Sequence, residues 1–256
     1  MVNLFRKHSR VDNNSIHNGV KLITVAQPKS VIAEQFRTIR TNISFMGIDR
    51  PIKSLAFTSA NVSEGKSTVA ANIAVVWANT GKRVLLIDAD LRRPTLHKTF
   101  NLSNQVGLTS ILTADEETVD ITSMVRGTDV NNLSVITSGP IPPNPAELLN
   151  SKRMRSLLNA VRNAFDVVIL DVPPLLEVSD TQALISQLDG VVLVVKVGQT
   201  QKIAAKRAVE LTKLSKARLL GYVMNDVGRG GDSAYGYGYG YGYGYGYGYG
   251  YSTDNK

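Results

Sequence analysis

Short runs of β-branched and other apolar residues recur along the chain, and longer segments of helical length separate them. Such runs have the length of strands that are buried on both faces. The predicted strands are Lys53–Thr58, Arg83–Ile87, Leu133–Ile136, Val167–Leu170, Gly190–Val195 and Leu219–Met224. The predicted helices are Ser67–Asn79, Pro145–Ala164, Ser179–Gln187 and Thr200–Lys216. This alternation predicts a doubly wound α/β fold, in which helices cover both faces of a mostly parallel sheet.

Composition divides the chain into three regions. Residues 1–30 are polar and basic, residues 31–227 are a mixed apolar and charged body, and residues 228–256 have a strongly biased composition. With 256 residues, of which 43% are hydrophobic, the chain can bury one globular core. We expect the body to carry the fold, preceded by a basic segment and followed by a tail.

The absence of cysteine and of long apolar runs limits the function classes. A chain without cysteine has no disulfide, no thiolate metal site and no cysteine nucleophile, so the cytosol is its simplest location. No run approaches the 18 or so apolar residues of a membrane span. Residues 1–30 also lack the apolar centre of a signal peptide, so we expect neither secretion by that route nor self-insertion.

The net charge of +8 is unevenly distributed. Residues 1–30 contain five basic residues and one acidic residue, a net charge of +4 that is half of the excess. A basic segment can favour anionic lipid, nucleic acid or an acidic partner, or it can be a solvated tail without a target. Because no zinc-finger or nucleic-acid sheet motif accompanies it, nucleic acid is not an expected partner.

The C-terminal region contains an uninterrupted repeat of tyrosine and glycine over Tyr235–Tyr251. Nine of the ten tyrosines of the chain lie in these 17 residues. Glycine at every second position makes ordering entropically costly and leaves no second face to pack, so we expect this repeat to be disordered. Self-association is the alternative, since low-complexity aromatic tracts can aggregate.

The run Phe57–Thr68 lies between a predicted strand and a predicted helix and matches the phosphate-binding P-loop, except that Ala60 replaces the first glycine. In such a loop backbone N–H groups surround the phosphates, and Gly65 permits the close turn. Lys66 neutralises phosphate charge and Ser67 is placed to ligate Mg²⁺. The expected ATP contacts in this loop are Glu64, Gly65, Lys66, Ser67 and Thr68.

Three aspartates follow predicted strands: Asp88 and Asp90 come after one, and Asp171 comes after another. Ligands of open α/β sheets bind at the carboxyl ends of the strands, so these acids can converge on the P-loop. A single such acid is often a cap or turn residue, but three together favour magnesium binding and proton transfer. We expect catalysis by Lys66, Asp88 and Asp90, with magnesium held by Ser67, Asp88 and Asp171. Which of Asp88 and Asp90 is the base stays open.

Asn225 ends the last predicted strand. Its amide could lie against the adenine ring, and the alternative is a turn-forming asparagine.

With these residues in place, the chain resembles the bacterial tyrosine kinases (BY-kinases) of capsule and exopolysaccharide operons, in the separate cytoplasmic form found in Gram-positive bacteria. The similar parts are the P-loop ending Glu64–Thr68, the Walker segment with Asp88 and Asp90, Asp171 as the Walker B acid, and the tyrosine-rich C-terminus. Pro142–Leu149 is also similar to a segment of the family. The resemblance covers nearly the whole chain.

The resemblance implies a protein-tyrosine kinase that uses ATP and Mg²⁺ and autophosphorylates its C-terminal tyrosine cluster in trans. The implied phosphoacceptors are Tyr235, Tyr237, Tyr239, Tyr241, Tyr243, Tyr245, Tyr247, Tyr249 and Tyr251. It also implies control of polysaccharide synthesis and export, a membrane-embedded chain-length regulator as activator, and a cognate tyrosine phosphatase. The protein would then be cytoplasmic and be recruited to the inner face of the cell membrane through its membrane partner.

The same resemblance identifies Glu34, Arg37 and Arg40 as a Glu-x-x-Arg-x-x-Arg motif that joins subunits into a ring. Residues three apart on a helix are neighbours, so these charges form a stripe that could bind a partner or pair within itself. Both interpretations stay open at this point.

Two other functions compete with the kinase. A partitioning-type switch ATPase has a second lysine in the phosphate loop, at the position that Asn61 occupies here, so this alternative is weaker. A nucleotide-gated scaffold would use the tyrosine–glycine repeat for self-association and leave its tyrosines unmodified. The length of the repeat supports the kinase hypothesis. When extended, its 17 residues span up to roughly 60 Å at ~3.3–3.6 Å each, which is enough to reach the active site of a neighbouring subunit.

Overall fold

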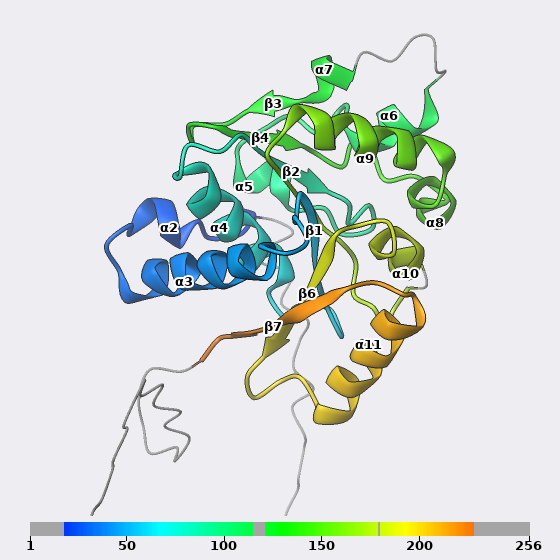
Figure 1. The fold of residues 1–256 in the computed structure, drawn as a ribbon. Helices are drawn as coiled ribbons and strands as arrows, with labels where there is room; N and C mark the ends of the chain where they lie inside the picture. Colours follow the sequence, from blue (N-terminus) through cyan, green and yellow to red (C-terminus); the bar gives the residue numbers. More distant parts are fainter. Residues whose placement is uncertain (1–17, 115–120, 179, 228–256) are drawn as a thin grey trace, which may run out of the picture.

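A computed structural model describes residues 18–114, 121–178 and 180–227. The predictions for residues 1–17 and for the phosphoacceptors of Tyr235–Tyr251 lie outside the described residues. The described part contains a seven-stranded sheet with helices on both faces (Figure 1). Its strands are β1 (Ser54–Ser59), β2 (Val84–Asp88), β3 (Arg126–Gly127), β4 (Leu133–Ile136), β5 (Val167–Asp171), β6 (Gly190–Lys196) and β7 (Leu219–Asn225).

The helices of the described part differ greatly in length. They are α2 (Ile23–Ala26), α3 (Val31–Met46), α4 (Lys66–Ala78), α5 (Leu96–Thr99), α6 (Leu108–Thr113), α7 (Ile121–Met124), α8 (Pro145–Leu149), α9 (Lys152–Ala164), α10 (Asp180–Ile185) and α11 (Lys202–Leu214). Within the described ranges, none of them is both long and apolar enough to cross a lipid bilayer.

The strand order is β3-β4-β2-β5-β1-β6-β7, and every neighbouring pair is parallel except β3 with β4. This confirms the predicted doubly wound α/β fold. The order places β2, β5 and β1 side by side, so their carboxyl ends meet at one edge of the sheet. The register pairs Asp88 with Asp171, and Phe57 with Asp171. Residues that follow these strands therefore converge, as the sequence predicts.

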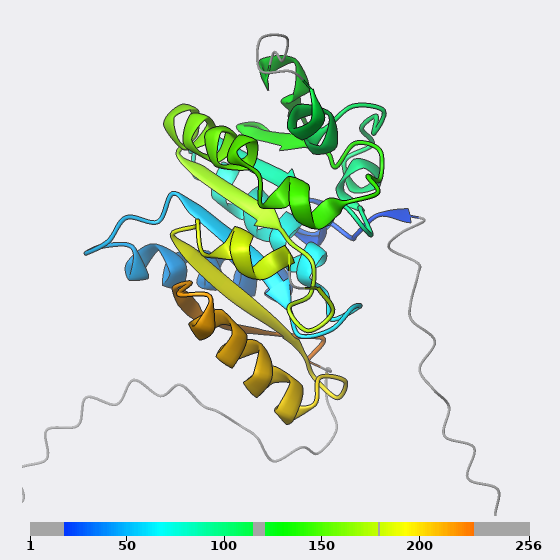
Figure 2. The same ribbon diagram turned by 90° about the vertical axis from the view of Figure 1, so that its right-hand side faces the viewer.

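The core has two layers, one on each face of the sheet. One face packs against α9, α10 and α11, and the other packs against α3 and α4 (Figure 2). The strands β1, β2 and β5 are buried throughout, which explains why their sequences are apolar on both faces. Helix α4 is also buried almost all round, because alanines let it pack closely between the sheet and α3.

All six predicted strands are confirmed, with ends that shift by at most one residue. The single helix predicted over Pro145–Ala164 is wrong, because the structure divides it into α8 and α9. Asn150 and Ser151 separate the two helices, and the Ser151 hydroxyl accepts the Met154 N–H at 3.1 Å as the N-cap of α9. A serine in the middle of an apolar periodic segment thus starts a new helix. The short antiparallel strand β3 was not predicted.

The packed unit begins before residue 31, where composition placed its boundary. The backbone N–H and hydroxyl of Thr24 donate to Oδ1 of Asn72 on α4, at 3.0 and 2.8 Å. The Asn72 amide in turn donates to the Lys21 carbonyl at 2.9 Å. Residues 21–24 are therefore part of the domain, and the separate basic segment stays a prediction for residues 1–17.

Candidate active site

The P-loop connects β1 to α4 and turns at Gly65. This residue has φ +94° and stands at the N-cap of α4. Its backbone conformation favours glycine, and a Cβ atom at this position would lie 2.0 Å from Nδ2 of Asn225 and would displace that side chain. The first backbone N–H groups of α4 lack partners within the helix, and a helix N-terminus favours negative charge. The loop is thus built to bind an anion.

The side chain of Glu64 fixes the shape of this loop. Its Oε2 accepts the backbone N–H groups of Ala60 and Asn61 at 2.9 and 3.1 Å. Its Oε1 accepts the Asn61 amide at 3.0 Å and the hydroxyl of Thr200, from the segment between β6 and α11, at 2.8 Å. The side chain is completely buried. The structure therefore gives its side chain a role in shaping the loop, and the contact of Glu64 with ATP stays a prediction.

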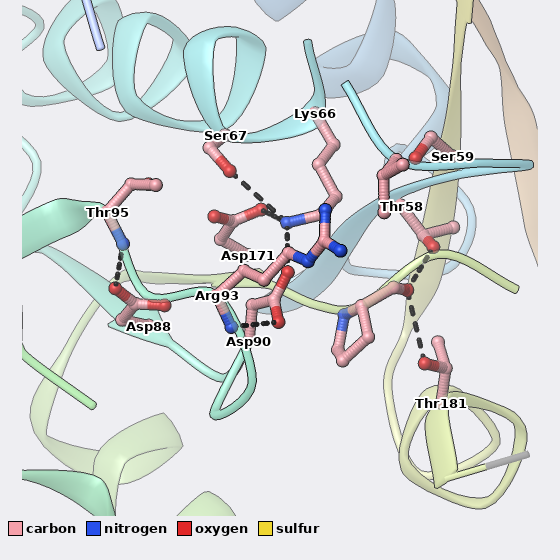
Figure 3. Close-up of polar contacts among 12 residues, drawn as sticks. Thr58, Ser59, Lys66, Ser67, Asp88, Asp90, Arg93, Thr95, Asp171 and Thr181 are labelled. Atoms are coloured by element: carbon pink, nitrogen blue, oxygen red, sulfur yellow. Dashed lines mark hydrogen bonds and ion pairs between the residues drawn. The ribbon is translucent and has the colours of Figure 1, made fainter. Parts of the chain in front are cut away.

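Lys66 lies between two carboxylates at the beginning of α4 (Figure 3). Its Nζ is 2.7 Å from Oδ2 of Asp90 and 3.2 Å from Oδ1 of Asp171, and it also donates to the Ser67 hydroxyl at 3.2 Å. Burial alone would lower the pKa of Lys66, but the charges of Asp171 and Asp90 outweigh burial and raise this pKa above its ordinary value. The lysine is therefore charged and held in place before any phosphate binds.

Asp88 and Asp171 are completely buried on adjacent strands. Oδ2 of Asp88 accepts the N–H groups of Thr95 and Leu96 at 3.1 and 3.0 Å. Its Oδ1 and the Oδ2 of Asp171 have no partner among the described residues. Burial raises the pKa of both carboxyls, and for Asp88 the charge of Asp171 adds to this effect.

The two unpaired oxygens fit a hard divalent cation, since Mg²⁺ prefers oxygen ligands. Within the described residues no group of three or more His, Cys, Asp or Glu side chains forms a complete metal site. Magnesium sites usually take one or two carboxylates and fill the remaining positions with substrate phosphates and water. Asp88 and Asp171, with the hydroxyl of Ser67 next to Lys66, match that pattern.

Asp90 differs from the other two acids. Burial would raise the pKa of Asp90, but the ion pair with Lys66 and the N–H group of Arg93 outweigh it and lower this pKa. Oδ1 of Asp90 accepts the Arg93 N–H at 3.1 Å. Asp90 also lines the cavity beside the P-loop, whereas Asp88 and Asp171 do not. Only Asp90 of the three acids thus faces the space where a substrate can bind.

A cavity of about 250 Å³ lies beside the P-loop. Val62 to Thr68, apart from Glu64, form one wall, and Asp90, Arg93 and Thr95 form another. Thr95 is 4% exposed, and its hydroxyl has no partner among the described residues. Sequence reasoning missed Thr95 and Thr200, since isolated threonines in turns carry no local signal.

Asn225 lines the far side of the cavity, where β7 ends. Its Nδ2 donates to the Glu64 carbonyl at 3.1 Å, so Asn225 contacts the P-loop, and its contact with adenine stays a prediction. Asp226 follows it and pairs with Lys196 at 3.6 Å. The side chains of β6 and β7 thus close the site on this side.

The charged stripe on α3 is engaged within the chain. Arg37 pairs with Glu34 at 2.5 Å and also donates to the Pro28 carbonyl. Arg40 donates to the carbonyl of Val76 near the end of α4, at 3.3 Å. The pairing within the helix, which the spacing left open, is present for Glu34 and Arg37. Their role in joining subunits stays a prediction.

Comparison with known proteins identifies the relatives of this site. Residues 52–217 match the family model described as an AAA domain. The chain is 51% identical over 215 residues to the tyrosine-protein kinase YwqD of Bacillus subtilis (strain 168), which covers 84% of this chain and 90% of that protein. The structure resembles the kinase domain of the Escherichia coli tyrosine kinase ETK with a TM-score of 0.79 and 30% identity, over 93% of this chain and 89% of that one. It also resembles the chimerical protein CapA2B2 with a TM-score of 0.75 and 37% identity, over 84% of this chain and 98% of that one.

Proposed function

The chain belongs to the family of bacterial tyrosine-protein kinases, and we propose that it transfers the γ-phosphoryl group of ATP to the tyrosines of its own C-terminal repeat. The observation that carries this proposal is the buried Lys66 between Asp90 and Asp171, at the end of a P-loop that opens into a cavity. This arrangement supports the proposal because Lys66, once it turns to the phosphates, would leave the Asp90 carboxylate free beside the transferring phosphoryl group.

Phosphate binding uses the loop and its lysine. The N–H groups around Gly65 and the start of α4 bind phosphate oxygens, and Lys66 exchanges its carboxylate partners for the β/γ-phosphates. Ser67, Asp88 and Asp171 would hold Mg²⁺, which supplies further neutralisation of phosphate charge. The N–H groups of Thr95 and Leu96 keep Asp88 oriented during these changes.

Asp90 is the group that positions the acceptor. When Lys66 turns to the phosphates, Oδ2 of Asp90 is released and faces the cavity, while the Arg93 N–H keeps Oδ1 in place. Oδ2 then accepts the phenolic proton as the tyrosine oxygen attacks. A phenol has a pKa of about 10, and the loose transition state of phosphoryl transfer needs only modest help from a base. Asp88 therefore acts as a metal ligand and Asp90 as the base.

The cellular role follows the family. We infer that the chain forms a ring through Glu34, Arg37 and Arg40, and that the repeat of one subunit reaches the cavity of the next. Its partners are a membrane-embedded polysaccharide chain-length regulator, which activates it and brings it to the inner face of the cell membrane, and a cognate tyrosine phosphatase. In this role it regulates the synthesis and export of capsular or exopolysaccharide. Support comes from the similarity to YwqD and to the CapA2B2 chimera.

The test is phosphate mapping by mass spectrometry after incubation with ATP and Mg²⁺, with the activator's cytoplasmic segment present. We expect phosphotyrosine within Tyr235–Tyr251 in the wild type and none in Lys66→Met. Lys202→Met, which changes an exposed lysine at the start of α11, is the matched control and should behave like the wild type. ATP hydrolysis without phosphotyrosine would indicate a switch ATPase, and neither activity would indicate a scaffold.

A further inference from the structure

A largely apolar groove runs between α3 and β7. It consists of two adjoining hollows of about 450 and 130 Å³, which share Ile39 and Val223 in their walls. Helix α3 contributes Val31, Ile32 and Met46 to the walls, and the chain from Leu220 to Val227 forms the opposite side. The groove thus follows β7 from Leu220 onward and ends at Val227, where the described chain ends.

The groove is separate from the predicted subunit-joining stripe. Successive residues of a helix are about 100° apart around its axis, which places Ile39 roughly opposite Arg37. The stripe of Glu34, Arg37 and Arg40 faces Pro28 and the end of α4, whereas Ile39 faces β7. Ring formation through the stripe therefore leaves the groove available.

Strand β7 is an edge strand with few of the usual protections. It is last in the strand order, so among the described residues no strand pairs with its outer side. Natural edge strands carry charges or proline, or are covered. Residues 219–225 contain no charged residue and no proline. Tyr222 is 70% exposed and Met224 is 54% exposed. A bulge near Gly221 twists the strand, but the edge beyond it remains apolar and is expected to be covered.

We propose that the chain's own tyrosine–glycine repeat, Tyr235–Tyr251, covers this edge by pairing with β7 as an antiparallel strand and seating its tyrosines in the groove. An extended chain points alternate side chains to opposite faces, so the repeat has tyrosine on one face and no side chain on the other. The edge of β7 has the apolar groove on one face, so a strand with tyrosines on one face only is complementary to it. The backbone supplies the pairing, and the tyrosines fill the hollow.

The connection favours the chain's own repeat over that of a second copy. The described chain ends at Val227, which itself lines the groove, and only residues 228–234 separate it from Tyr235. Three of these seven residues are glycine, which suits a reversal of direction. A connection this short gives an effective concentration in the millimolar range, on the order of that for short flexible linkers.

Docking of the repeat in the groove should depend on whether its tyrosines are phosphorylated. Asn225 and Asp226 line both the groove and the ATP cavity, so seated tyrosines lie beside the active site without entering it. Phosphorylation adds about −1.5 to −2 charge to a tyrosine, and an apolar groove disfavours that charge. The unmodified repeat is therefore held in the groove and the modified repeat is released. This second step rests on the proposed kinase function, whereas docking does not.

Hydrogen–deuterium exchange of the full chain without ATP tests the docking directly. In the wild type we expect the amides of the repeat and of β7 to exchange at least about tenfold more slowly than in a variant with serine in place of the nine repeat tyrosines. Ile32→Glu, which places a charge in the groove, should remove this protection. Phe45→Glu, at an exposed apolar position of α3 outside the groove, is the matched control and should retain it.

The other outcomes overturn the proposal. An unprotected repeat in the wild type, or protection that Ile32→Glu leaves unchanged, would exclude this groove. Protection that disappears on dilution would assign the groove to the repeat of a second copy. Adding ATP and Mg²⁺ then tests the kinase function and the release of the modified repeat separately. If protection persists and no phosphotyrosine forms, the kinase function is contradicted. If protection persists on a phosphorylated repeat, release is contradicted.

Discussion

Replacing Glu64 with alanine should open the P-loop without unfolding the domain. The substitution removes a buried acceptor of four hydrogen bonds, which come from the backbone of Ala60 and Asn61, the Asn61 amide and the Thr200 hydroxyl. The Asn61 amide and the Thr200 hydroxyl are partly buried and can turn to water. The two backbone N–H groups are fixed by the loop and lose their partner.

The expected cost follows from these two groups. A buried donor without a partner costs about 1–3 kcal/mol, so two of them cost roughly 2–6 kcal/mol if the loop keeps its shape. A domain of this kind is stable by about 5–15 kcal/mol, so most molecules stay folded. The loop can recover part of the cost by opening to water, and it then loses the arrangement that binds phosphate. We expect a stability loss of about 2–4 kcal/mol and an apparent affinity for ATP at least about tenfold weaker.

Three milder variants separate the contributions of these bonds. Glu64→Gln keeps an oxygen for the N–H groups of Ala60 and Asn61 and should lose less than about 1.5 kcal/mol. Thr200→Val removes one bond and should cost about 1 kcal/mol, whereas Thr200→Ser restores it. Urea unfolding gives the stability, and calorimetric titration with ADP gives the affinity. If Glu64→Ala unfolds at the wild-type urea midpoint and binds ADP as tightly as the wild type, Glu64 does not shape the loop.

Three further predictions concern single positions. Asp88→Asn should stabilise the nucleotide-free protein at neutral pH, because burial raises the pKa of Asp88 and folded molecules therefore bind this proton more tightly than unfolded ones. The contribution of Asp88 to stability should be lost as the pH rises above about 4, so calorimetry across pH should show that the wild type loses stability relative to the variant, which also lacks kinase activity. Gly65→Ala should abolish ADP binding in a titration, because its left-handed φ costs about 1–2 kcal/mol and its Cβ meets Asn225. Arg37→Ala should change urea stability by less than about 1 kcal/mol, since its pair with Glu34 is exposed, yet lower the oligomer mass in sedimentation.

The fold could be predicted from sequence because its strands are buried on both faces. Their apolar runs are bounded by turns, and no other common arrangement buries six such runs alternating with helices. The division of Pro145–Ala164 could not be predicted by periodicity, because both helices present apolar residues at compatible positions and only the cap at Ser151 separates them. The early start of the domain was hidden for a similar reason, since Thr24 joins it through a hydrogen bond to Asn72 on another helix.

The candidate site was predicted as a set of residues, but their division of labour depends on contacts that are distant in the chain. Asp88, Asp90 and Asp171 have the same local signal, an acid after an apolar strand. Strand order makes Asp88 and Asp171 register partners and removes both from water, which leaves each with an unpaired oxygen suited to a cation. Asp90 lies two residues beyond its strand, in the turn that borders the cavity, where it pairs with Lys66. A shift of two residues along the chain thus separates a proposed metal ligand from a proposed base, and the neighbouring strand, not the local sequence, distinguishes the two environments.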